Sequence, residues 1–416
     1  MIKKNVIILS ERYAWLIASF IYTFYLAKTI NIEIYGSYSL ILSYVTIVSF
    51  YSLLSLNQTD IKDIVSKRND FIDLIFGKMI ISIFMFAFVS MITYFFYEKL
   101  INSVGFYSIF FILLAYFFSG ASYADIWTQS DLKLECYLLV RIILIISLLC
   151  LKIYLVDSDT TLFETAILFF LDYFLLFIWS CIFLFKNRIN FLNNSGVSHI
   201  YTSIKKYTIK IRNNYHLVLS FIMITMYSRI DQYMIGTLSG NINDVAYLSI
   251  LSKMQEGLTV IVTAFGISQF PNLVKSKLDE KYNCSARRFT IKSMIILMFL
   301  AVLYYCIAPY IVKFIFNHTI ENYVILLYSI SIFFCGLSIV TGRLLIIDNL
   351  PKVALYRNIV ALILNLCINY FLIPLYSIQG AAIASCVSWF ISGFLFLVLY
   401  NKTRYYFFRV KVKNDK

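Results

Sequence analysis

Long apolar segments alternate with short polar ones along the whole chain. A membrane-spanning helix needs about 20 mostly apolar residues, and twelve segments of this sequence meet that requirement. These segments are residues 13–31, 37–56, 74–97, 104–123, 134–156, 163–185, 215–237, 245–268, 290–315, 322–346, 353–375 and 378–400. The pattern therefore predicts an all-α integral membrane protein with about twelve transmembrane helices.

The composition supports the same prediction. Hydrophobic residues make up 61% of the 416 residues, and charged residues only 14%. A soluble globular domain is roughly half apolar and about a quarter charged. The apolar surplus is too large for one buried core, so lipid must solvate the remainder.

Basic residues are distributed unevenly between the two sides of the predicted bundle. With the N-terminus in the cytoplasm, 27 Lys and Arg residues fall on the cytoplasmic side and only four on the other. Basic residues concentrate in the cytoplasmic loops of membrane proteins, so this rule accounts for the net charge of +14 without nucleic-acid binding. We predict a multi-pass inner-membrane protein with both termini in the cytoplasm. The first apolar segment lacks a small-residue cleavage site and reads as a retained helix.

A long basic segment divides the chain into two similar parts. Residues 186–214 hold six basic residues and no acidic ones, with six predicted spans on either side. We therefore predict an N-terminal six-helix lobe (1–185), a basic cytoplasmic linker (186–214) and a C-terminal six-helix lobe with a cytoplasmic tail (215–416).

Short matches between the lobes point to an internal repeat. Residues 35–43 open the second span much as residues 245–252 open the eighth, and Arg141 has a counterpart in Arg357. Six spans is an even number, so the two lobes would share one orientation in the membrane. Chance similarity within an apolar chain is the alternative explanation.

Several kinds of chemistry find no support in the sequence. None of the eight cysteines forms a CxxC pair, and the three histidines lie near span ends, so neither a disulfide framework nor a metal centre is predicted. The sequence has no GxxxxGK[ST] phosphate loop and no HExxH helix. We expect a transporter without catalytic residues, metal or cofactor.

Charged residues inside the predicted spans are the candidate functional residues. Placing a charge at the centre of a span costs about 2.5–3.5 kcal/mol on insertion scales, so such residues usually face a cavity or pair with one another. The candidates are Arg141, Asp172, Arg229, Asp231, Lys253, Glu256 and Arg343. The four bases predict a cationic cavity for an anionic substrate, because a guanidinium binds phosphate oxygens in pairs. The three acids would carry a coupling ion or form ion pairs.

Structural roles remain open for most of these residues. Lys253 and Glu256 are three residues apart and share a helix face, which also suits a simple intrahelical pair. Arg229 could form an interhelical ion pair, and Arg141 and Arg343 could extend to the headgroups. Asp172 is predicted either to pair with an arginine or to take up the coupling ion.

Three regions of the chain resemble flippases for polysaccharide repeat units, of the Wzx type. The matching residues are Tyr25–Ile30 with Tyr35–Ser39, then Tyr227–Gly236 with Val245–Tyr247, and then Asn365, Asn369, Leu372–Pro374 and Gly380–Ser385. Two positions depart from the pattern. Residues 31–33 replace the usual Leu-Gly-Pro, and Gln232 replaces a common Arg, which removes one candidate cationic ligand.

The resemblance implies the multidrug/oligosaccharidyl-lipid/polysaccharide exporter superfamily, with two MATE-like six-helix lobes forming a V around a central cavity. It implies that an undecaprenyl-diphosphate-linked oligosaccharide moves from the cytoplasmic to the periplasmic leaflet, for O-antigen (lipopolysaccharide) or capsule synthesis. Expected partners are this substrate, membrane lipid, and as candidates a repeat-unit polymerase and a chain-length regulator. A multidrug or small-ion exporter of the same fold is the alternative. A membrane polymerase or ligase is disfavoured because every predicted periplasmic loop is short.

Overall fold

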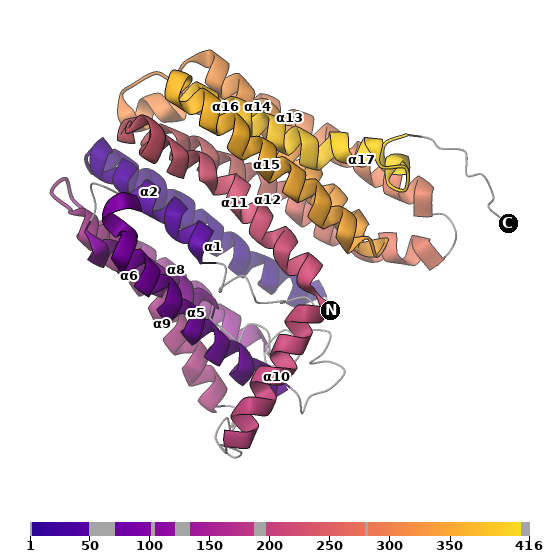
Figure 1. Ribbon diagram of the computed structural model, residues 1–416, viewed down its shortest axis with the longest axis horizontal. Coiled ribbons are helices and arrows are strands. Elements are labelled where there is room, and N and C mark those ends of the chain that lie inside the picture. Colours follow the sequence, from indigo (N-terminus) through magenta and orange to yellow (C-terminus); the bar gives the residue numbers. More distant parts are fainter. Residues whose placement is uncertain are drawn as a thin grey trace. The chain divides into compact units, whose positions relative to one another are not determined.

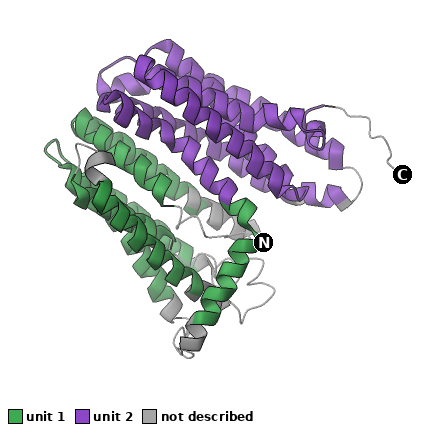
Figure 2. Ribbon diagram, viewed as in Figure 1, with its two compact units in different colours: residues 1–218 green, residues 219–416 purple. Residues whose placement is uncertain are grey.

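The computed structural model describes residues 2–49, 71–100, 105–120, 134–186, 197–278 and 282–408. Every regular element within these residues is a helix (Figure 1). The chain divides into two compact units, Met1–Val218 and Leu219–Lys416 (Figure 2). The predicted lobe boundaries, and the predicted cavity between the lobes, stay predictions.

The first unit packs its helices in pairs that are distant in sequence. Its helices are α1 (Ile2–Thr29), α2 (Ile32–Val48), α5 (Phe71–Leu100), α6 (Phe106–Gly120), α8 (Leu134–Leu155), α9 (Leu162–Lys186) and α10 (Val197–Asn213). Helix α6 packs along α9, α1 along α8, and α10 along α5. Aromatic rings fill the contact between α6 and α9, as where Phe118 meets Phe177 at a centroid distance of 4.9 Å.

The second unit is built around a central helix. Its elements are α11 (Tyr215–Met234), η2 (Ile235–Ser239), α12 (Ile242–Leu278), α13 (Tyr282–Phe316), α14 (Asn322–Ile347), α15 (Pro351–Tyr376), α16 (Ile378–Phe390), η3 (Ile391–Leu395), α17 (Phe396–Leu399) and η4 (Arg404–Tyr406). Helix α14 contacts α12, α13, α15, α16 and η3. It is therefore the most enclosed of the long apolar helices.

The all-α membrane fold predicted from the sequence is confirmed. A helix lies at the position of each of the twelve predicted spans. Within the described residues, eight helices are long and apolar enough to cross a membrane, and α2 and α6 are shorter apolar helices. The ends of the second and fourth predicted spans, after residues 49 and 120, lie outside the described residues.

Helix α10 was not predicted, because residues 186–214 were interpreted as a loop. Residues 187–196 lie outside the described part of the chain, but Val197–Asn213 form a helix. A Cβ at Gly77 of α5 would overlap the backbone carbonyl of Ser203 on α10, so the two helices cross in close contact. The helix is amphipathic and polar on average, and a search for long apolar runs does not detect such a segment.

Small residues allow close packing in the second unit as well. A Cβ at Gly393 would overlap the backbone carbonyl of Phe334, so the π-helical segment η3 lies directly against α14. Gly336 of α14 similarly leaves room for Leu297 of α13. π-Helical segments widen a helix by one residue per turn and often occur at functional sites. The carbonyl of Ser392 in η3 accepts a hydrogen bond from the buried Arg357.

Candidate functional site

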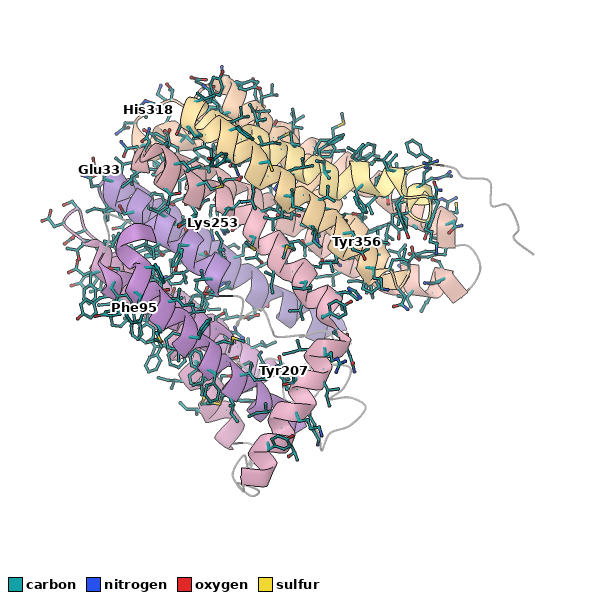
Figure 3. All side chains as sticks on the ribbon, viewed as in Figure 1. Glu33, Phe95, Tyr207, Lys253, His318 and Tyr356 are labelled. Carbon is teal, nitrogen blue, oxygen red and sulfur yellow. The ribbon has the colours of Figure 1, made fainter. Side chains whose placement is uncertain are left out.

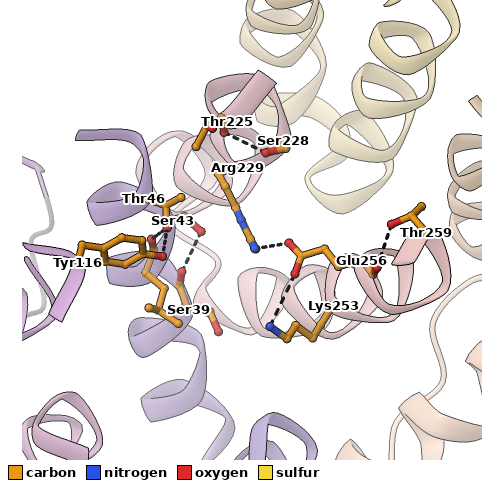
Figure 4. Close-up of polar contacts among 11 residues, drawn as sticks. Ser39, Ser43, Thr46, Tyr116, Thr225, Ser228, Arg229, Lys253, Glu256 and Thr259 are labelled. Atoms are coloured by element: carbon orange, nitrogen blue, oxygen red, sulfur yellow. Dashed lines mark hydrogen bonds and ion pairs between the residues drawn. The ribbon is translucent and has the colours of Figure 1, made fainter. Parts of the chain in front are cut away.

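Arg229, Lys253 and Glu256 form a polar triad between α11 and α12. The Arg229 guanidinium donates a hydrogen bond to Oε1 of Glu256, while the Lys253 ammonium lies 3.6 Å from Oε2 (Figure 4). These side chains are 23%, 24% and 42% exposed, respectively. Two bases thus share one acid at a site that remains accessible, which leaves the three side chains with a net charge of +1.

The sequence placed all three of these residues among the candidates but did not join Arg229 to Glu256. The Lys253–Glu256 pair follows from their spacing on one helix. The contact of Arg229 with Glu256 spans 27 residues and links two helices, so only packing brings it about.

Asp231 follows Arg229 by two residues on α11 but lies in a different environment. Its carboxylate is buried and accepts hydrogen bonds from Nδ2 of Asn365 (3.0 Å), from Nδ2 of Asn369 (2.6 Å) and from Oγ of Ser385. These donors come from α15 and α16 and are all neutral. Hydrogen bonds of this kind favour the charged form of a carboxylate, whereas burial disfavours it.

The partners of Asp231 entered the sequence analysis only through the family resemblance. A signal was nevertheless present, because Asn365 and Asn369 are one helical turn apart within an otherwise apolar span. Both side chains are fully buried. Buried amides inside a span are expensive unless they are hydrogen-bonded, so their spacing predicts a shared partner.

Asp172 pairs with Lys152, which lies inside the predicted span 134–156 but was not among the candidate residues. Nζ of Lys152 on α8 lies 2.5 Å from Oδ2 of Asp172 on α9, and both side chains are buried. The same ammonium lies 3.7 Å from the ring centroid of Tyr22 on α1, a favourable cation–π contact. Of the two alternatives predicted for Asp172, an ion pair is present, but its base is Lys152 rather than an arginine.

Arg141 is also engaged by an acid. Its Nε lies 3.1 Å from Oε1 of Glu11 on α1, and both side chains are largely buried. Together with Lys152 and Asp172, this pair ties α1 to α8 and α9. Arg141 remains a predicted ligand, but an anion would have to displace Glu11 to reach it.

Arg343 has an environment unlike those of the other predicted bases. Nη2 donates a hydrogen bond of 2.8 Å to the backbone carbonyl of Thr263, and the guanidinium lies over Gly266, where a Cβ would stand 2.9 Å from Cζ. The side chain is half-buried. Among the described residues it has no carboxylate partner, so its remaining donors are available to an anion.

Arg357 is a buried cation that the sequence analysis treated only as a repeat counterpart of Arg141. Its guanidinium donates to Oγ1 of Thr341 (2.9 Å), to the carbonyl of Ser338 (3.1 Å) and to the carbonyl of Ser392 in η3 (3.2 Å). Only 3% of the residue is exposed. It therefore crosslinks α14, α15 and η3 through neutral acceptors.

Metal ligands do not cluster in the described part of the chain. No group of three His, Cys, Asp or Glu side chains that could hold a metal ion occurs among the described residues. The contacts observed at the candidate residues are ion pairs and hydrogen bonds.

Comparisons with known structures identify the fold. The chain matches an inward-facing multidrug resistance MATE family transporter of the MOP superfamily, with a TM-score of 0.71 and 10% identity over 91% of this chain and 92% of the other. It also matches the lipid II flippase MurJ in an inward closed conformation, with a TM-score of 0.72 and 12% identity over 98% and 89%. The chain has the fold of these transporters.

A second MATE structure agrees with this assignment. The Vibrio cholerae MATE transporter VcmN in the bent form matches with a TM-score of 0.61 and 13% identity, over 97% of this chain and 99% of the other. No protein-family model matches the sequence, and neither does any curated protein. The MATE and MurJ fold and the apolar helices show a multi-pass membrane protein, whereas the cargo has to be argued from the residues.

Proposed function

We propose that the protein is a flippase that moves an undecaprenyl-diphosphate-linked oligosaccharide repeat unit from the cytoplasmic to the periplasmic leaflet. The triad of Arg229, Lys253 and Glu256 carries this proposal, because it is accessible and holds two bases for one acid. The fold, shared with a structure described as a lipid II flippase, supports it.

In the proposed mechanism the diphosphate competes with Glu256 for its two basic partners. Arg229 presents a planar fork that suits two phosphate oxygens, and Lys253 adds a compact charge beside it. Arg343 is a second anchor, since it has no acidic partner among the described residues. The lipid tail stays in the bilayer and the lobes alternate in access, so no covalent bond is made or broken.

Coupling to an ion would make the movement directional, and we assign this role to Asp231. Of the three acidic candidates, Glu256 contacts two bases and Asp172 contacts Lys152. In the described structure Asp231 is held only by neutral donors. A proton or a monovalent cation can therefore neutralise it without breaking an ion pair.

A multidrug exporter of the same fold is the second candidate function. The observation that favours it is the exposed fraction of Glu256, 42%, because an accessible carboxylate can bind a cationic drug. The two functions make opposite demands on this residue. A cationic cargo needs the carboxylate, whereas an anionic cargo competes with it.

Substitution of Glu256 separates the two functions. With the purified protein and undecaprenyl diphosphate as the probe, we expect Glu256→Gln to bind at least as tightly as the wild type and Lys253→Gln to bind more weakly. Binding of undecaprenyl diphosphate that fails in Glu256→Gln but survives in Lys253→Gln would contradict the proposal. Ethidium efflux from cells that make the wild-type protein, above the level of cells without it and lost in Glu256→Gln, would support the drug-exporter function.

The second experiment is deletion of the gene in its host. We expect complete lipid-linked repeat units to accumulate on the cytoplasmic leaflet. Normal translocation, with single unpolymerised units reaching the cell surface, would instead indicate a polymerase or ligase. Complementation by Glu256→Gln but not by Lys253→Gln would connect the cellular defect to the triad.

A further inference from the structure

Helix α10 carries charge of one sign on a short amphipathic segment. Its 17 residues include Lys205, Lys206, Lys210 and Arg212 and no acidic residue. The helix packs against α5 near Gly77, the seventh residue of α5, and only Asn214 separates it from α11. The candidate membrane span of α5 begins at Gly77, and α11 covers the predicted span 215–237, so α10 lies beside the end of a membrane helix.

The two sides of α10 differ in burial. Ser203, Tyr207 (labelled in Figure 3) and Lys210 recur at helical spacing and are buried, and the first two lie against Gly77 of α5. The opposite stripe consists of Tyr201, Lys205, Thr208 and Arg212, all of which are exposed. The helix thus has a packed face and a second face that no described element covers.

The exposed face combines cations with amphipathic and apolar side chains. Tyr201 is 66% exposed and the neighbouring Ile209 is 48% exposed. Lys205 and Arg212 have no carboxylate partner in the described part of the chain. Tyrosine side chains favour the membrane–water interface, and basic side chains near a membrane surface attract anionic headgroups.

We propose that the exposed face of α10 binds the headgroups of anionic phospholipids. The basic residues supply charge complementary to the lipid phosphate, and Tyr201 and Ile209 enter the headgroup region, as in helices that lie in the interface plane. The position of α10 directly before a membrane helix favours a lipid over a soluble acidic partner. This surface is separate from the triad, so the inference stands whatever the cargo is.

The test compares two double variants of the full-length protein in detergent. K205Q/R212Q removes two exposed charges from α10, and R288Q/K292Q removes two exposed charges from α13 as the matched control. Bound phosphatidylglycerol is counted by native mass spectrometry, with phosphatidylcholine as the neutral reference. We expect K205Q/R212Q to bind phosphatidylglycerol roughly tenfold more weakly, while the control variant and phosphatidylcholine binding are unchanged.

Two further measurements keep the proposal falsifiable. The charge-preserving swap K205R/R212K should bind like the wild type, because headgroup attraction depends on charge. Binding of phosphatidylglycerol by the wild type should also weaken as salt rises, since salt screens exposed charges. Equal loss in both double variants, no loss in K205Q/R212Q, or salt-independent binding would overturn the proposal.

Discussion

Asn369 donates a hydrogen bond of 2.6 Å to Asp231, from a position 138 residues further along the chain. Asn365, one turn earlier on α15, donates to the same oxygen at 3.0 Å. These contacts hold a buried carboxylate without neutralising it. A group in this state is suited to exchange a cation, because the surrounding amides can rotate to present either their N–H groups or their oxygens.

The first prediction concerns this carboxylate. Asp231→Asn preserves the shape of the side chain but removes its charge, so we expect a folded protein with reduced transport. The expected loss is roughly 5- to 150-fold, which corresponds to a typical coupling free energy of about 1–3 kcal/mol. Complementation of the deletion strain measures the loss, and cation-dependent thermal stabilisation of the purified protein should vanish with it. Asp244→Asn is the control, since Asp244 lies in the first turn of α12 and accepts a hydrogen bond from Ser377. Normal transport by Asp231→Asn would remove the coupling role.

The second prediction concerns the buried pair of Lys152 and Asp172. Asp172→Asn leaves Lys152 as an unpaired buried cation, which should cost about 3–5 kcal/mol of unfolding free energy. Chemical denaturation in detergent measures this loss. The double variant K152M/D172L removes both charges and should be clearly more stable than the single variant. Equal destabilisation of the two would show that the pair, rather than the orphaned charge, matters.

The third prediction concerns Arg357 and its three neutral acceptors. Arg357→Lys keeps the charge but cannot reach Thr341, Ser338 and Ser392 together, because an ammonium lacks the planar fork. We expect a loss of about 2–4 kcal/mol, at roughly 1 kcal/mol or more for each lost bond. Arg343→Lys, which gives up one such bond, should lose less unfolding free energy when the two variants are compared by chemical denaturation in detergent. A larger effect at Arg343 would contradict this ranking.

The fourth prediction concerns the close contact between η3 and α14. Gly393→Ala places a methyl group against the backbone carbonyl of Phe334, which cannot move independently of its helix. Overpacking of this kind costs about 1–3 kcal/mol, so the melting temperature should fall. Gly105→Ala is the matched control, because nothing lies within 4 Å of a Cβ there. An unchanged melting temperature for Gly393→Ala would mean that the helices are not in tight contact.

The fifth prediction concerns the segment after the last membrane helix. Tyr405 and Tyr406 both donate hydrogen bonds to Oδ2 of Asp348, with a donor–acceptor distance of 2.5 Å for Tyr405. Burial and the nearby carboxylate raise the pKa of both phenols well above their usual value of about 10. The folded state therefore holds these protons more tightly than the unfolded chain, and the stabilisation is complete below about pH 10 and declines at higher pH.

The variant Y405F/Y406F tests this contact. At pH 8 we expect it to melt at a lower temperature than the wild type and to be cut faster by trypsin after Arg404. The difference in melting temperature should shrink above about pH 10, because the two phenols ionise in the unfolded wild-type chain but stay protonated in the folded one. Tyr400→Phe serves as the control because Tyr400 is exposed and has no side-chain bond to Asp348. A difference that grows with pH would contradict the assigned sign.

The sequence predicted which residues are unusual better than it predicted their partners. Asp172 and Arg229 stood out as charges within apolar runs, yet Lys152 was not among the candidates and Glu256 was matched only with Lys253. Arg357 was noticed only for its place in the repeat. Ion pairs between helices depend on helix rotation and crossing, and the period of apolar residues does not specify these for spans that are apolar all round.

The approximate positions and the order of the apolar helices were determined by the sequence alone, because crossing hydrocarbon requires a continuous apolar run and that requirement is local. Helix α10 shows the limit of this rule, since a short polar helix is stabilised by its contact with α5 rather than by its own composition. The tertiary structure alone decided that Asp231 meets Asn369 and that Arg357 meets Ser392. Buried polar groups in lipid need partners, and the packing of distant helices determines which partners they find.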